Sequence, residues 1–137
     1  MMKKLLCAVL CLMLLPISAL ASINGVAYEV FVASYADADG NGMGDLNGLT
    51  SKLDYIASLG VQAIWLMPIS PSPSYHKYDV TDYCAIDAAY GTLADFEAFA
   101  ADCHARGLSV LLDLVLNHTS KEHPWFVSAC ESLCVEP

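Results

Sequence analysis

Basic side chains are scarce in this sequence. Its 137 residues contain 6 Lys and Arg against 15 Asp and Glu, which gives a formal net charge of −9 at pH 7. Nucleic acids and anionic membrane surfaces are bound mainly through Lys and Arg. The charge balance therefore argues against both as partners, and it favours cations or neutral ligands.

The chain also lacks an apolar run that suits a permanent membrane anchor. Its N-terminal run, residues 5–15, is shorter than the about 20 residues that a membrane-spanning helix needs. Lys3 and Lys4 precede the run, and Ala19-Leu20-Ala21 follows it. A basic start, a short apolar core and an A-x-A end are typical of a secretory signal peptide. We therefore expect a secreted or periplasmic protein that is cleaved after Ala21, with one domain over residues 22–137.

A complete zinc-site pattern is missing as well. Cys130 and Cys134 are closely spaced, but no second close Cys/His pair completes a tetrahedral site with them. Cys84 and Cys103 are the other cysteines beyond the expected cleavage point. Export permits disulfides, and the sequence does not choose among the three pairings that four cysteines allow.

Oxygen-bearing side chains recur at every second position in one glycine-rich stretch, residues 37–45. They are Asp37, Asp39, Asn41 and Asp45, and Met43 can offer its backbone carbonyl at the remaining position. Calcium takes about six to eight oxygen ligands, and the intervening glycines let the chain coil tightly enough for these oxygens to converge. The pattern fits the start of an EF-hand loop, but Gly48 stands where the bidentate Glu should be. We therefore expect a calcium-holding loop between a strand and a helix. A solvated Asp/Gly turn without an ion is the alternative.

Apolar strand patterns alternate with helical ones along the chain. The expected strands are residues 26–32, 61–66 and 108–116; the expected helices are residues 49–59, a helix capped by Thr92 and ended by Gly107, and a short helix starting at His123-Pro124. This alternation builds right-handed βαβ units and a parallel sheet. Polar residues follow each strand, at 37–45, 70–82 and 113–118. Because chemistry gathers at the carboxyl ends of parallel strands, we expect all three clusters on one rim.

Four segments, in order, resemble one enzyme family. They are VAYEVFVASYADADGNGMGDLNGLTSKLD at 26–54, SPSYHKYDVTDY at 72–83, GLSVLLDLVLNHTS at 107–120 and EHPWF at 122–126. Together they cover most of residues 26–128 and resemble the α-amylase family of glycoside hydrolases. The resemblance implies the α/β class and the first three β/α units of a (β/α)8 TIM barrel, incomplete in this chain. It also implies an enzyme that cleaves α-glucosidic linkages in starch-like glucans or maltooligosaccharides by a retaining mechanism.

The resemblance assigns roles to individual residues. Tyr78 matches an aromatic that stacks on the sugar beside the scissile bond, and His118 matches a histidine that hydrogen-bonds the same sugar. Asp113 matches a rim aspartate that positions catalytic partners. Residues 37–45 match the calcium loop of many members, so calcium is the implied cofactor, and Asn117 matches a ligand of a second calcium. Each of these residues also has a plain structural alternative, such as a loop aromatic, an internal carboxylate or a strand-end histidine.

The chain departs from the family in its catalytic acids. The family's nucleophilic Asp, acid/base Glu and third Asp come from strands four, five and seven, and none of the 15 carboxylates here matches them. Retaining glycosidases need two carboxyl groups about 5–5.5 Å apart. We therefore name no catalytic residue and expect this chain alone to be inactive. Ala33 also stands where many relatives carry Arg. A secreted, non-catalytic, calcium-dependent glucan-binding or interaction module is the alternative function.

Overall fold

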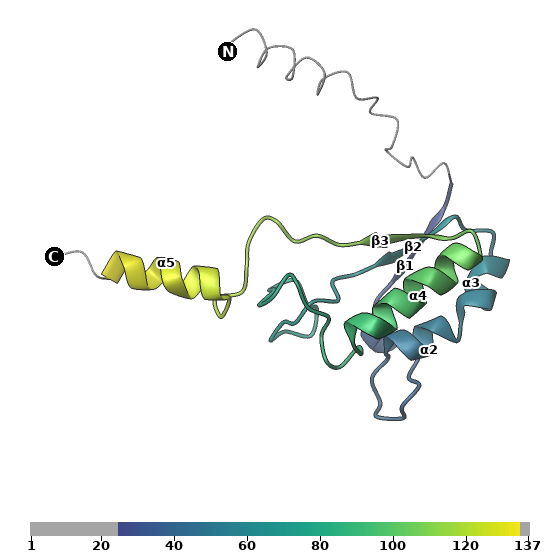
Figure 1. The fold of residues 1–137 in the computed structure, drawn as a ribbon, viewed down its shortest axis with the longest axis horizontal. Helices are drawn as coiled ribbons and strands as arrows, with labels where there is room; N and C mark the ends of the chain where they lie inside the picture. Colours follow the sequence, from purple (N-terminus) through teal and green to yellow (C-terminus); the bar gives the residue numbers. More distant parts are fainter. Residues whose placement is uncertain (1–24, 135–137) are drawn as a thin grey trace, which may run out of the picture.

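Three parallel strands and the helices between them make up the core of the fold. The structure, a computed structural model, describes residues 25–134 (Figure 1). Its elements are β1 (Ala27–Val30), the 3-10 helix η1 (Val32–Ser34), α2 (Leu46–Thr50), α3 (Leu53–Ser58), β2 (Ala63–Leu66), α4 (Leu93–Ala105), β3 (Ser109–Leu112) and α5 (Pro124–Cys134). The sheet order is β1-β2-β3, with both pairs parallel. This is the predicted α/β class, with the arrangement of three consecutive barrel units. The predicted signal peptide and its cleavage point lie outside the described residues.

The strands are shorter than their apolar runs because each extends only as far as its neighbour. Leu66 at the end of β2 pairs with Leu112 at the end of β3. The backbone N–H of Asp113 still donates to the Leu66 carbonyl, at 3.1 Å. Beyond Leu66 the chain reaches Pro68, which has no backbone N–H to continue a ladder. The strand predicted over 108–116 therefore ends early, and the remaining leucines of that run are exposed.

The helix predicted over 49–59 is wrong in its extent. It starts earlier, at Leu46, because Asp45 caps it, and it is interrupted at Ser51-Lys52. At this break the Thr50 hydroxyl donates to the Leu46 carbonyl at 2.7 Å, and the Ser51 hydroxyl donates to Gly48 at 2.6 Å. Such side-chain bonds compete with the helical pattern. The segment therefore forms two short helices, α2 and α3.

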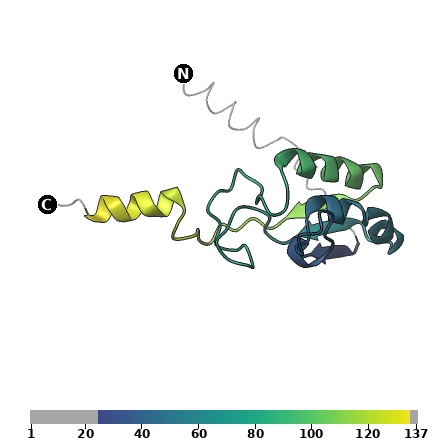
Figure 2. The same cartoon turned by 90° about the horizontal axis from the view of Figure 1, so that it is seen from below.

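The hydrophobic core joins the sheet to α2, α3 and α4. Thr92 caps the N-terminus of α4, as predicted, through a reciprocal capping box with Asp95, and α4 buries Phe99 and Cys103. Burial raises the pKa of the Cys103 thiol to about 11. In both Figure 1 and Figure 2, α5 stands apart from the sheet and from the other helices. The core therefore lies at the end of the molecule opposite α5.

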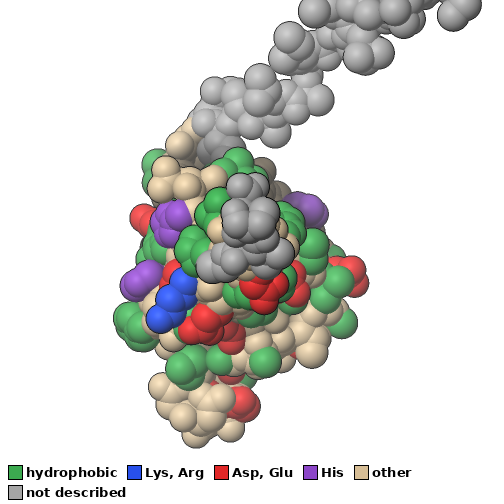
Figure 3. Space-filling view, turned by 90° about the vertical axis from the view of Figure 1, so that its left-hand side faces the viewer, with side chains coloured by type: hydrophobic (Ala, Val, Ile, Leu, Met, Phe, Trp, Pro, Cys, Tyr) green, Lys and Arg blue, Asp and Glu red, His purple; other side chains and the backbone are tan. Residues whose placement is uncertain are grey.

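The surface carries the acidic excess that the composition shows. On the face in Figure 3, acidic side chains are interspersed with hydrophobic ones, while Lys and Arg form one small patch. Cys84, Cys103 and Cys130 have free thiols. No helix within residues 25–134 combines the length and the apolar composition that crossing a membrane would require.

Candidate functional site

Asp113 and Tyr78 meet at the rim formed by the carboxyl ends of the strands. Asp113 directly follows β3, and Tyr78 lies in the long loop between β2 and α4. The Tyr78 hydroxyl donates to Asp113 Oδ2 at 2.5 Å. The hydrogen bond to Asp113, together with burial and the charges of Asp113 and Glu29, raises the pKa of Tyr78 to about 12. Two of the residues to which the resemblance assigns a role at the substrate site are thus in direct contact.

Trp65 is a third member of this cluster, and the sequence analysis missed it. Its indole Nε1–H donates to Asp113 Oδ1 at 2.8 Å. The signal for it was the strand alternation: Ile64 and Leu66 are buried, whereas Trp65 between them is 39 % exposed and faces the other side of the sheet. The apolar run of residues 61–66 predicts a buried strand, and it gives no sign that the polar end of the indole reaches Asp113.

His118 is anchored through its backbone. The Tyr83 hydroxyl lies 2.9 Å from the His118 carbonyl and 2.7 Å from the Val115 carbonyl. The His118 ring is exposed, with Nδ1 3.2 Å from the Asn117 side-chain nitrogen. Within residues 25–134, no hydrogen bond links this ring to Tyr78 or Asp113. The structure therefore places His118 beyond the same strand end without joining it to the other two side chains.

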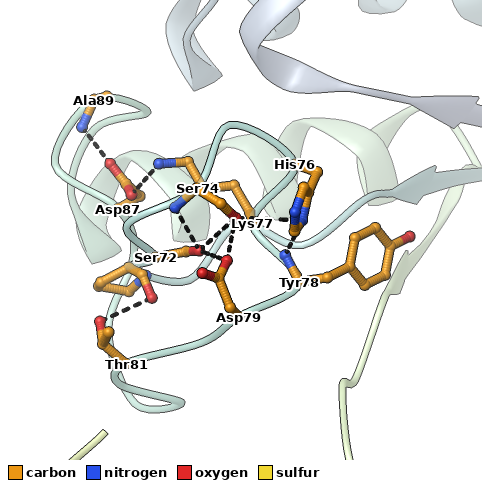
Figure 4. A network of polar contacts seen from close by, with 10 residues as sticks. Ser72, Ser74, His76, Lys77, Tyr78, Asp79, Thr81, Asp87 and Ala89 are labelled. Atoms are coloured by element: carbon orange, nitrogen blue, oxygen red, sulfur yellow. Dashed lines mark hydrogen bonds and ion pairs between the residues drawn. The ribbon is translucent and has the colours of Figure 1, made fainter. Parts of the chain in front are cut away.

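A polar network stiffens the loop that presents Tyr78 (Figure 4). Ser72 donates to Asp79 Oδ1 at 2.5 Å, and Ser74 donates to the same oxygen. Burial alone would raise the pKa of Asp79, but these hydrogen bonds outweigh it and hold the pKa below its ordinary value. The backbone N–H of Tyr78 donates to His76 Nδ1 at 3.1 Å. The Tyr78 ring points away from this network, with the His76 ring 6.0 Å from it and its hydroxyl group bonded to Asp113.

Lys77, next to Tyr78, has an unusual backbone conformation. Its φ is 66°, a left-handed value that costs a non-glycine residue energy. Its ammonium group forms an ion pair with Asp87 at 2.5 Å, and only 12 % and 13 % of the two side chains are exposed. The same nitrogen lies 5.5 Å from the centroid of the Tyr90 ring. This largely buried anchor holds the strained turn that carries Tyr78.

The glycine-rich stretch 37–45 folds so that its carboxylates converge. Asp37, Asp39 and Asp45 each place one oxygen within 4.8 Å of the others. The backbone N–H groups of Gly42 and Gly40 donate to Asp37, and they lower the pKa of its carboxyl group. Both glycines have positive φ, 88° and 80°, which makes this tight return possible.

The remaining donors of the stretch surround the same turn. Asp45 is only 7 % exposed; its Oδ1 accepts from Gly48 N at 2.7 Å and its Oδ2 from Ala38 N at 2.8 Å. Asn41 Oδ1 accepts from the N–H of Met43 at 2.8 Å. A carboxylate has about four lone-pair sites, so these bonds leave acceptor capacity for a cation. The donor set consists of oxygens, as a hard divalent cation requires.

Comparison with known proteins gives one consistent result. Residues 29–136 match the family model described as alpha amylase, catalytic domain. The chain is 57 % identical over 109 residues to Alpha-amylase 3 of Dictyoglomus thermophilum, covering 80 % of this chain and 22 % of that protein. It is 50 % identical over 110 residues to Glucan 1,6-alpha-glucosidase of Streptococcus pneumoniae, covering 80 % and 21 %.

Solved structures agree with the sequence comparisons. Eubacterium rectale Amy13B matches with a TM-score of 0.78 and 59 % identity, over 80 % of this chain and 22 % of that one. The alpha-amylase from H. orenii matches with a TM-score of 0.76 and 54 % identity, over 78 % and 24 %. The chain thus spans about a fifth to a quarter of the length of these relatives. By sequence and by fold, this chain belongs to the α-amylase family, and its described strands and helices correspond to N-terminal units of the family's catalytic TIM barrel.

Proposed function

We propose that this chain supplies the first three β/α units of an exported glycoside hydrolase that cleaves α-glucosidic linkages by a retaining mechanism. One observation carries the proposal: Tyr78 and Asp113 are hydrogen-bonded to each other at the rim where enzymes of this architecture bind their substrates. The basic start and the A-x-A end of residues 1–21 support export. None of the 15 carboxylates matches the nucleophile or the acid/base residue that the family resemblance implies. In this proposal, groups outside the described residues supply them.

The proposed substrate is an α-glucan or a maltooligosaccharide. The face of the Tyr78 ring can stack on the C–H face of a sugar ring, while Asp113 and His118 offer acceptor and donor groups to sugar hydroxyls. The names of the relatives include both alpha-amylases and a glucan 1,6-alpha-glucosidase, so they support the α-glucosidic class.

We propose calcium as the ion of the stretch 37–45. Asp37, Asp39, Asn41 and Asp45 would hold it through side-chain oxygens, and Met43 through its backbone carbonyl. The convergence of three carboxylates supports this role, as does the lowered pKa of Asp37, which keeps that ligand ionised. A bound ion would neutralise the carboxylates and hold the turn between η1 and α2 together.

NMR titration of the chain with maltotriose tests the sugar site. We expect chemical-shift changes at Tyr78 and His118, and none with the β-linked cellotriose. Tyr78→Ala should abolish the changes, whereas Tyr55→Ala should preserve them, because Tyr55 is 57 % exposed on α3, outside the rim. Equal responses to both sugars, or an unaltered response in Tyr78→Ala, would contradict the proposal.

An assay on starch separates the proposed fragment role from a complete enzyme. We expect no turnover by the 137-residue chain, because no nucleophile and no acid/base residue has been identified in it. Reproducible release of reducing sugar by the purified chain would show that its own carboxylates suffice.

A further inference from the structure

Trp65 occupies an unusual place for a large aromatic residue. It sits in the middle strand of the sheet, with its neighbours Ile64 and Leu66 fully buried in the core. Its own side chain points to the opposite side and is 39 % exposed. Because β2 is hydrogen-bonded to a strand on each side, its backbone is held more firmly than those of the edge strands β1 and β3. A side chain on this strand is therefore a rigid reference point for its neighbours.

The Trp65 indole contacts the rim through one hydrogen bond, which it donates to Asp113. Its Nε1–H donates to Asp113 Oδ1 at 2.8 Å, across 48 residues of sequence. Indole has one N–H donor and no acceptor, so this contact can be made in one sense only. A hydrogen bond to a carboxylate is charge-assisted and stronger than one between neutral groups. The bond therefore fixes the rotation of the Asp113 carboxylate.

The fixed carboxylate presents its second oxygen to Tyr78. With Oδ1 bound to the indole, Oδ2 points to the Tyr78 hydroxyl, 2.5 Å away. The loop network holds the Tyr78 backbone, and the His76 ring lies 6.0 Å from the Tyr78 ring at an interplanar angle of 35°. At the other end of the ring, the hydrogen bond to Asp113 fixes the direction of the hydroxyl group.

We propose that Trp65 is a positioning residue that orients Asp113 and, through it, the ring of Tyr78. The consequence for sugar binding rests on the proposed function. Without the bond to Asp113, a smaller fraction of molecules would hold the Tyr78 ring in the orientation that stacks on the sugar, and sugar binding would weaken. The geometric part of the proposal concerns the free chain and does not depend on any sugar. Trp65 itself need not touch the substrate.

Hydrogen exchange of the two indole N–H groups tests the geometry directly in the unaltered chain. The sequence contains two tryptophans, and Trp125 is 69 % exposed, so it serves as an internal control. We expect the Trp65 indole N–H to exchange roughly tenfold more slowly than that of Trp125, as a hydrogen bond to a charged group would cause. Asp113→Ala should remove this difference. Equal exchange in the unaltered chain would overturn the proposal without any variant having to fold.

Trp65→Phe tests the step from Asp113 to Tyr78. Phenylalanine keeps an aromatic ring on the strand but removes the N–H donor, and Trp125→Phe is the matched control. In a ¹³C-detected titration of the tyrosine ring, we expect the pKa of Tyr78 to fall in Trp65→Phe from about 12 towards 10.0. It should stay near 12 in Trp125→Phe. Asp113 and Glu29 are the charged groups that raise this pKa, and both remain in either variant.

The outcomes separate positioning from packing. An unchanged pKa of Tyr78 in folded Trp65→Phe would mean that Trp65 only fills space. An increase would mean that the indole competes with Tyr78 for the carboxylate, and either result would refute the proposal. Maltotriose titration of Trp65→Phe adds the functional consequence, with weaker shifts expected at Tyr78. If the unaltered chain binds no maltotriose, the proposed function fails while the exchange and pKa results still decide the role of Trp65.

Discussion

Substitutions at Asp39 and Asp45 should both remove the response to calcium but should differ in their effect on stability without calcium, because the two side chains make different contacts. Asp45 is nearly buried and binds two backbone N–H groups, those of Gly48 and Ala38, so it caps α2 and closes the turn with or without an ion. Asp39 is exposed and bonds only to Asn41, two residues away. Asp39→Asn therefore keeps a turn-forming side chain while it removes a full negative charge from the proposed ligand set.

The expected magnitudes follow from these contacts. Loss of an Asp N-cap costs about 0.5–2 kcal/mol, and Ala38 lies at the surface, where water can replace part of the second bond. Asp45→Ala should therefore lower the free energy of unfolding by about 1–3 kcal/mol even without calcium. Asp39→Asn should change it by less than about 0.5 kcal/mol without calcium. At a calcium concentration a hundredfold above Kd, binding stabilises the unaltered chain by about 2.7 kcal/mol.

Urea denaturation with EDTA and with millimolar calcium measures all three proteins on one scale. We expect calcium to raise the midpoint of the unaltered chain and to leave both variants where they were in EDTA. A full calcium response in Asp39→Asn would refute the ligand assignment. The absence of a response in the unaltered chain would show that the stretch 37–45 is a solvated turn.

Three further predictions concern stability. Thr92→Ala breaks the capping box of α4 and should lower the free energy of unfolding by about 1 kcal/mol in urea, with a shift in midpoint and no change in slope. Lys77→Met leaves the Asp87 carboxylate largely buried without its cation and should cost about 1–3 kcal/mol; a double-mutant cycle with Asp87→Asn should recover a favourable coupling energy, and a zero coupling would contradict the importance of the pair. Stability should fall as the pH rises from about 10 to about 12, because three tyrosines stay protonated in the folded chain after their unfolded counterparts ionise; a flat alkaline profile of the circular dichroism signal would argue against these raised pKa values. The three are Tyr35, Tyr78 and Tyr90.

Local patterns in the sequence were sufficient for part of the fold. α4 was predicted with its correct cap because Thr92 and the periodic apolar residues that end at Cys103 are near one another in the chain. The parallel sheet followed from the alternation of apolar segments and helices. By contrast, the break between α2 and α3 depends on hydroxyl groups that bond backward to carbonyls, and helical periodicity carries no sign of that choice.

The candidate site was predictable only where a residue carried its own chemical signal. The places of Tyr78 and Asp113 after two strands predict that both lie on one rim, and the resemblance to the α-amylase family assigns their roles. Trp65 was not named, because its role arises from a partner 48 residues away, and a tryptophan inside an apolar run is ordinarily a core residue. Contacts of this range are set by how the strands register, and the register became visible only in the folded chain.

The strand order β1-β2-β3 has a consequence for how the polypeptide forms on the ribosome. Each strand pairs with the one made just before it, so no strand has to wait for a distant partner to emerge. The β1–α2–α3–β2 unit can close once Leu66 has left the exit tunnel, and α4 with β3 then adds to an existing edge. Assembly in the direction of translation keeps the time for which apolar strands remain exposed short.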